Sequence, residues 1–131
     1  MKRKYVCLAA LAAWAGSAAV VLAADVAEGE KIFNQKCKVC HQIGESAKNF
    51  VGPELNGLIG RKTGSAPDYN YSDANKNSGL TWDEANLKEY LADPKKMIPG
   101  TKMIFAGLPK ENDRDNLVAF LAQFDASGKK K

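Results

Sequence analysis

Three chemically reactive side chains of this sequence lie within five residues of one another. The sequence has 131 residues, three cysteines and one histidine, and Cys37, Cys40 and His41 form the pattern Cys-x-x-Cys-His. A disulfide between cysteines this close would constrain very little of the chain. The pattern therefore indicates a chemical role for both thiols, and the rest of the chain has to fold around whatever they hold.

The spacing of these three residues is the attachment pattern of a c-type haem. Each thiol can add to one haem vinyl group as a thioether, and the adjacent His41 can reach the iron as proximal ligand. A structural zinc site would need four protein ligands. A thiol oxidoreductase would need a βαβ setting around the cysteines, and no strand is predicted. We therefore expect one covalently attached haem c, with its iron, per chain.

The N-terminus has the layout of a secretory signal. Basic residues occupy positions 2–4, an alanine-rich apolar run covers 5–24, and small residues precede Asp25. This order predicts a signal peptide over 1–24, cleaved before Asp25 or one residue earlier, and a single domain over 25–131 that ends in a short basic tail. Cys7 would leave with the signal. The alternative is an uncleaved membrane anchor, because about 20 apolar residues can cross a bilayer.

The excess positive charge lies in this N-terminal stretch. The formal net charge is +4, but three of the 19 basic residues lie at positions 2–4 and all 15 acidic residues follow Ala24. The domain itself is nearly neutral, which gives no support to nucleic-acid binding. A mitochondrial transit peptide would be amphipathic and Arg-rich. The signal therefore favours the periplasm over the mitochondrial intermembrane space.

The hydrophobic periodicity predicts an all-α domain, without a convincing strand or repeat. We expect three or four short helices, over residues 26–36, from 72 or 73, over 82–93 and over 110–123. Two of these helices would begin with capping boxes, formed by Asp25 with Glu28 and by Thr81 with Glu84.

The loops between the helices are long for so small a domain. Frequent glycine and proline residues predict loops over 42–70 and 94–109, and the final lysines at 129–131 are expected to fray. Loops of this length indicate function or disorder. These loops carry apolar side chains, among them Leu55 and Phe105, which argues against disorder. We therefore expect an apolar group that is not polypeptide to fill the middle of the domain.

The function of a haem in this position depends on the sixth ligand of its iron. An open position would indicate a peroxidase or a gas sensor, whereas a protein ligand would indicate electron transfer. There is no second histidine, so the candidates are Met97, Met103, the lysines and the tyrosines. Either methionine could instead fill a gap in the core, and spacing alone gives Met103 only a small preference.

Four stretches of the chain resemble class I cytochrome c of the mitochondrial type and its bacterial relatives. They are CKVCH, VGPELNGLIGRKTGSAP, YSDANKNSGLTW and YLADPKKMIPGTKMIFAGL, and the resemblance covers nearly all of 25–124. It implies the small cytochrome c fold wrapped around one haem. The methionine of PGTKM is the axial ligand in that family, which implies that His41 and Met103 hold the iron.

The resemblance also implies roles for residues around the haem. The Pro53 carbonyl would accept a hydrogen bond from the His41 ring and tune its basicity. The side chains that match those around the haem propionates are Tyr71, Trp82 and Arg61. Those that match a polar network near the methionine are Asn75, Tyr90 and Thr101. The residues that match the crossing of the first and last helices are Gly29, Phe33, Leu117 and Phe120.

The implied activity is one-electron transfer, so the chain is not expected to be an enzyme. The donor would be a quinol:cytochrome c oxidoreductase, and the acceptor a terminal oxidase, a photosynthetic reaction centre or a periplasmic reductase. A soluble monomer would dock on these complexes transiently through charge. The lysines that match a ring around the exposed haem edge are Lys36, Lys95, Lys96 and Lys102.

Overall fold

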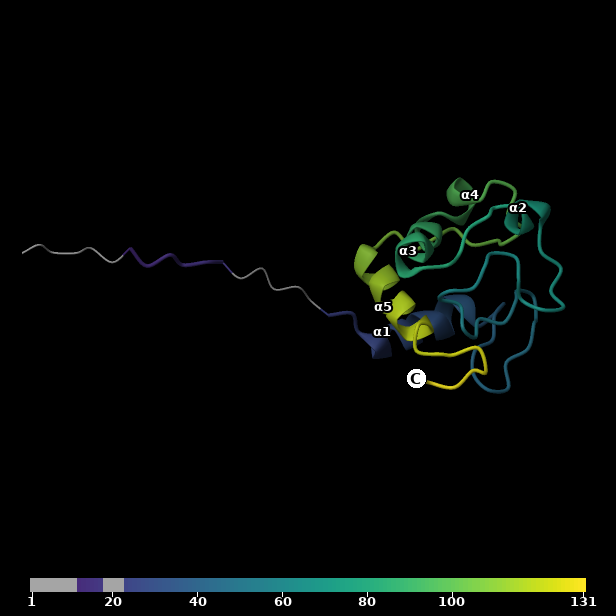
Figure 1. Ribbon diagram of the computed structural model, residues 1–131, viewed down its shortest axis with the longest axis horizontal. Helices are drawn as coiled ribbons and strands as arrows, with labels where there is room; N and C mark the ends of the chain where they lie inside the picture. The colour runs from purple at the N-terminus through teal and green to yellow at the C-terminus, as the bar shows by residue number, and fades with distance from the viewer. Residues whose placement is uncertain (1–11, 18–22) are drawn as a thin grey trace, which may run out of the picture.

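The computed structural model describes residues 12–17 and 23–131 and confirms the predicted all-α fold. Its helices are α1 (Val26–Ile32), the π-helix η1 (Phe33–Cys37), α2 (Asp73–Lys76), α3 (Glu84–Ala92), α4 (Pro94–Met97) and α5 (Glu111–Leu121). In the described part of the chain the only extended pairings are two isolated bridges, Lys62 with Thr81 and Phe124 with Lys130. Helices α1 and α5 pack together on one side of the molecule, and α2 lies on the opposite side (Figure 1).

The close contact between α1 and α5 depends on a glycine. A Cβ atom at Gly29 would lie 2.0 Å from the Asn116 carbonyl oxygen and 2.9 Å from Cβ of Phe120. One turn later, the Phe33 ring packs on the Phe120 ring with centroids 5.5 Å apart. Leu117 is fully buried beside them. The helix crossing that the sequence predicted is therefore present, and it fixes the start of the segment that carries the cysteines.

The N-terminal capping box of α1 is only half formed. The Asp25 side chain accepts from the Glu28 amide at 3.1 Å, as predicted. The Asp25 amide, however, donates to Oδ1 of Asn116 in α5 at 2.7 Å and not to the Glu28 side chain. The Glu28 side chain instead pairs with Lys31. The tertiary contact between the helices has replaced the local bond.

The predicted capping box of α3 is wrong by two residues. Asp83, not Thr81, is the N-cap, and its side chain accepts from the Asn86 amide at 2.7 Å while Oδ1 of Asn86 accepts from the Asp83 amide at 2.9 Å. Thr81 is held outside the helix by its bridge to Lys62. The Trp82 amide likewise donates to the Arg61 carbonyl at 2.9 Å. These pairings keep the backbone extended until residue 83.

Two further predictions need correction. Residues 94–97 are not a loop but form the short helix α4. Pro94 ends α3 and is the first residue of α4, a position that proline fits, and the Asp93 side chain caps the Lys96 amide at 3.2 Å.

The last lysines are not frayed either. Oδ1 of Asp125 accepts from the Lys129 amide at 3.0 Å, and the Lys131 amide donates to the Gln123 carbonyl at 2.8 Å.

The predicted signal peptide lies largely outside the described residues, because 1–11 and 18–22 are not described. Cys7 and the basic residues at 2–4 are among those left out. None of the helices in the described part of the chain has the length and apolar composition that a membrane-spanning segment requires.

Candidate haem-binding site

A cavity of about 500 Å³ lies between the loops and the helices, within the usual range of about 300–1,000 Å³ for ligand sites. It brings together most of the residues that the sequence singled out. The predicted residues that line it are Lys36, Cys37, Cys40, His41, Pro53, Arg61, Tyr71, Asn75, Trp82, Tyr90, Thr101, Lys102 and Met103. Lys95, Lys96 and Met97 are not among the lining residues.

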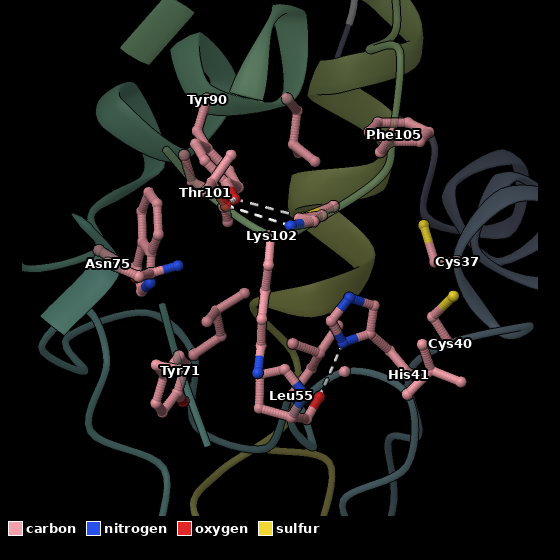
Figure 2. A pocket seen from close by; sticks show the side chains of 18 of the residues that line it. Cys37, Cys40, His41, Leu55, Tyr71, Asn75, Tyr90, Thr101, Lys102 and Phe105 are labelled. Carbon is pink, nitrogen blue, oxygen red and sulfur yellow. Dashed lines mark hydrogen bonds between the residues drawn. The ribbon is translucent and has the colours of Figure 1, made fainter. Parts of the chain in front are cut away.

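Cys37 and Cys40 lie together at one edge of this cavity, next to His41 (Figure 2). Cys37 is the last residue of η1, and the amides of Cys40 and His41 both donate to its carbonyl, at 3.0 and 2.9 Å. This tight turn aims both thiols at the same space. Neither forms a disulfide. Burial, with a smaller contribution from Cys40, raises the pKa of the Cys37 thiol to about 11, so this thiol is neutral near pH 7.

The imidazole of His41 is oriented by the backbone. Its Nδ1 donates to the Pro53 carbonyl at 2.7 Å, which is the predicted hydrogen bond and leaves Nε2 as the nitrogen available to a metal. Gly52 packs directly on the ring, since a Cβ there would lie 2.4 Å from Cε1 of His41. Burial lowers the pKa of His41, although the bond to Pro53 opposes the shift. The ring is therefore neutral near pH 7, the form that binds metals.

Met103 lies in the loop after α4, with its sulfur held by a polar network. The Tyr90 hydroxyl donates to Sδ of Met103 at 3.3 Å and lies 3.3 Å from Oγ1 of Thr101. Oγ1 of Thr101 also accepts from the Met103 amide at 3.3 Å. Asn75 lines the same cavity, where its buried Oδ1 has no hydrogen-bond partner. A buried acceptor of this kind is expected to be satisfied by a bound group or by water.

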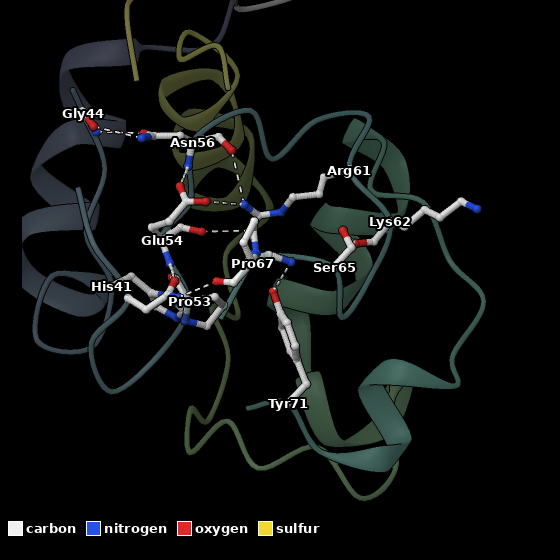
Figure 3. A network of polar contacts seen from close by, with 12 residues as sticks. His41, Gly44, Pro53, Glu54, Asn56, Arg61, Lys62, Ser65, Pro67 and Tyr71 are labelled. Atoms are coloured by element: carbon white, nitrogen blue, oxygen red, sulfur yellow. Dashed lines mark hydrogen bonds and ion pairs between the residues drawn. The ribbon is translucent and has the colours of Figure 1, made fainter. Parts of the chain in front are cut away.

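The three residues matched to the propionate region make different contacts. Tyr71 accepts from the Ala66 amide at 2.9 Å, and the Trp82 ring packs on Tyr90 with centroids 4.9 Å apart. Arg61 turns toward Glu54, as described below (Figure 3). Tyr71 and Trp82 thus have packing or backbone partners in addition to the cavity that they line.

The mouth of the cavity is apolar with a basic border. Val39, Val51 and Ile104 line it and are 71%, 61% and 94% exposed. Lys36 and Lys102 also line the cavity and are exposed, which places them at its border. The Lys102 amine donates to the Asn70 carbonyl and lies 4.9 Å from the Tyr69 ring centroid. The charge of Lys102 is therefore held in position at the border.

The apolar side chains of the loops indicated that the domain surrounds an apolar group, but the sequence did not show which residues form the walls of the cavity. The walls are formed by Leu55, Leu58, Leu87, Leu91, Leu117 and Leu121. The leucines of α3 and α5 have the spacing of a buried helix face, which does not distinguish a cavity wall from ordinary core. The two loop leucines have no periodicity that assigns them a face. Glu54, which holds Arg61, was also missed, because nothing in its sequence context indicates a partner seven residues away.

These groups fit a covalently bound haem. Two thiols at one edge match two vinyl groups, and the leucine walls suit an apolar macrocycle. A neutral imidazole nitrogen and a thioether sulfur facing one cavity are donors that haem iron accepts as axial ligands. The fold and the site therefore define a small haem protein of the c type.

Comparisons with known proteins agree with this class. Residues 26–125 match the family Cytochrome c. The chain is 66% identical to cytochrome c-550 of Bradyrhizobium diazoefficiens over 103 residues, 79% of this chain and 75% of that protein. It is 59% identical to cytochrome c-554 of Methylosinus trichosporium over 125 residues, 95% of this chain and 94% of that protein. The structure of cytochrome cH from Methylobacterium extorquens has a TM-score of 0.69 at 52% identity, covering 74% of this chain and 96% of that one.

The chain belongs to the cytochrome c family. It is a bacterial-type electron carrier and not an enzyme, and its cofactor is covalently attached haem c with iron. Cys37 and Cys40 fit the attachment motif of that cofactor. It carries electrons between membrane redox complexes.

Proposed function

We propose that His41 and Met103 are the two axial ligands of the haem iron, and that the chain shuttles single electrons in the periplasm. The observation that supports this most is the convergence of Nε2 of His41, Sδ of Met103 and both thiols on one cavity. Met97, the competing methionine, lies outside the lining. The bound haem supplies a one-electron couple between ferric and ferrous iron.

The protein contributes binding, orientation and a low-dielectric setting. Pro53 and Gly52 keep the His41 ring in one tautomer and one orientation, and Tyr90 with Thr101 does the same for the Met103 sulfur. Two neutral ligands and apolar walls favour the less charged ferrous state, so the reduction potential should be high for a haem protein. Because both ligands are fixed before and after transfer, little rearrangement is required.

The proposal also covers the export signal, the redox partners and the residues around the haem. Residues 1–24 act as an export signal and residues 25–131 form the working domain. The donor is a quinol:cytochrome c oxidoreductase, and the acceptor is a terminal oxidase, a reaction centre or a periplasmic reductase. Tyr71, Trp82 and Arg61 surround the haem propionates, and Asn75, Tyr90 and Thr101 form a polar network near Met103. N-terminal sequencing of the exported protein tests the signal: a first residue at or next to Asp25 supports it, and an intact Met1 supports a membrane anchor.

Docking is proposed at the cavity mouth. The exposed apolar residues there offer a contact that excludes water, and Lys36 and Lys102 supply positive charge at its border. Lys95 and Lys96 are exposed on α4, outside the cavity, and would extend the charged area. Such an interface gives fast, weak and salt-sensitive association, which an electron carrier requires.

The optical spectrum of the ferric protein tests the ligand set. A methionine–iron bond gives a weak far-red band, which we expect in the parent. The band should be lost in Met103→Ala and kept in Met97→Ala, the matched control. A parent spectrum of high-spin haem, or loss of the band only in Met97→Ala, would contradict the proposal. A high-spin parent would point instead to a peroxidase or a gas sensor with an open sixth position.

A further inference from the structure

A half-buried ion pair lies beside the haem cavity. Nη1 of Arg61 is 3.1 Å from Oε1 of Glu54, and the two side chains are only 14% and 21% exposed (Figure 3). The pairing of Glu54 with Arg61 has no counterpart among the roles assigned so far. Because solvent screens a pair at this depth weakly, its charges act on their surroundings more strongly than surface charges do.

The position of both charges is fixed by further hydrogen bonds. Arg61 donates from Nη1 to the Asn56 carbonyl at 3.2 Å and from Nη2 to the Glu54 carbonyl at 2.8 Å. Oε2 of Glu54 accepts from the Asn56 amide at 2.7 Å. Each partner thus has contacts that hold it in one orientation.

The pair is built on the loop that orients His41. Pro53, whose carbonyl accepts from the His41 ring, directly precedes Glu54. Arg61 is among the residues that line the cavity and Glu54 is not. Arg61 therefore forms part of the wall of the haem space, and the Glu54 carboxylate holds its guanidinium from outside the lining.

Reduction adds one negative charge to the iron group, so a nearby cation favours the ferrous state and a nearby anion favours the ferric state. We propose that Glu54 tunes the reduction potential of the haem: its carboxylate offsets the charge of Arg61 and keeps the potential below the value that Arg61 alone would set. Glu54 is thus a positioning and charge-compensating residue. The inference rests on the haem site proposed above.

Redox titration of the haem-loaded protein tests this role. Glu54→Gln removes the charge and keeps the shape, so the midpoint potential should rise. Glu45→Gln removes the same charge from an exposed position and should shift the potential less. Glu54→Asp keeps the charge and should stay near the parent. The proposal would be overturned if the midpoint potential of Glu54→Gln equalled that of the parent or that of Glu45→Gln. It would also be overturned if Glu54→Asp shifted the potential as much as Glu54→Gln does.

A second comparison covers the case in which Glu54→Gln does not assemble with haem, since it leaves Arg61 unpaired. The double variant Glu54→Gln/Arg61→Gln removes both charges and should have a higher potential than Arg61→Gln, where the carboxylate is left alone. Equal potentials in these two variants would overturn the proposal. The far-red band is recorded in every sample. Its absence from the parent refutes His41–Met103 ligation. A band that is retained in the parent and the variants, with potentials that do not differ between them, refutes only the role of Glu54.

Discussion

The Tyr90 hydroxyl makes its contacts in a nearly closed environment. The residue is 5% exposed, and its hydroxyl donates to Sδ of Met103 and lies beside Oγ1 of Thr101. Burial raises the pKa of Tyr90 above its ordinary value of 10.0, although the hydrogen bond with Thr101 opposes the shift. The neutral hydroxyl is therefore part of the folded structure at neutral pH, and ionising it works against folding.

This pKa shift predicts a pH dependence at the residue scale. At neutral pH, Tyr90→Phe should lower the free energy of unfolding by about 1 kcal/mol, the usual value of one hydrogen bond. Above pH 10 the unfolded parent loses the proton before the folded parent does, so the contribution of Tyr90 to stability declines. Chemical denaturation of both proteins on either side of pH 10 should show the difference between them shrinking. A difference that stays constant or grows would contradict the assignment.

At the scale of elements, the α1–α5 crossing tolerates no side chain at Gly29. The atoms that a Cβ would meet are mainly the Asn116 backbone, at 2.0 and 2.6 Å, which cannot move aside by a rotamer change. Overpacking typically costs about 1–3 kcal/mol, and this contact should reach the upper end of that range.

Gly29→Ala is therefore expected to lower the free energy of unfolding by about 3 kcal/mol. Glu30→Ala, at the exposed neighbouring position of α1, should change it by less than about 0.5 kcal/mol. Denaturant titrations of the two variants and the parent give the comparison. Equal stability of the two variants would show that the helices can separate at this point without loss.

The elements differ in how far the sequence could predict them. The helices 26–36, 82–93 and 110–123 were found to within a few residues, because their apolar spacing follows the α-helical period. The cap of α3 was missed because the bridge of Lys62 with Thr81 is a contact between distant residues. The folded tail was missed for a different reason: Asp125 holds it by local side-chain bonds, and this stretch has no hydrophobic pattern that would indicate order.

The residues of the site also differ in how far the sequence could predict them. The grouping of Cys37, Cys40 and His41 could be predicted from spacing alone, because haem attachment needs them adjacent in sequence. Spacing gave only a small preference for Met103 over Met97 as the sixth ligand. The fold distinguishes the two methionines, because Met103 lines the cavity and Met97 does not. The proposed role of Glu54 could not be predicted from the sequence, because it depends on where the fold brings Arg61.

At the scale of the whole molecule, charge is distributed unevenly on a nearly neutral domain. Lys36 and Lys102 lie at the cavity mouth, while Glu30, Glu111 and Asp113 lie on α1 and α5. This distribution should orient the protein as it approaches an acidic partner.

Lys36→Glu is therefore expected to slow reduction by a bacterial quinol:cytochrome c oxidoreductase several-fold at low ionic strength. The effect should fade as salt shortens the Debye length to about 10 Å at 0.1 M. Lys62→Glu makes the same charge change at an exposed residue outside the cavity lining and should have less effect. Equal slowing by both variants would mean that net charge matters and the docking face does not.

Carbon monoxide binding to the ferrous protein tests most directly whether this haem carries electrons or binds small molecules. If Met103 fills the sixth position, the parent should bind carbon monoxide slowly or not at all on rapid mixing. Met103→Ala should bind it fast, which shows that the gas can reach the iron once the sulfur is gone. Rapid binding by the parent, at the rate of the variant, would mean that the sixth position is open and that His41–Met103 ligation is wrong.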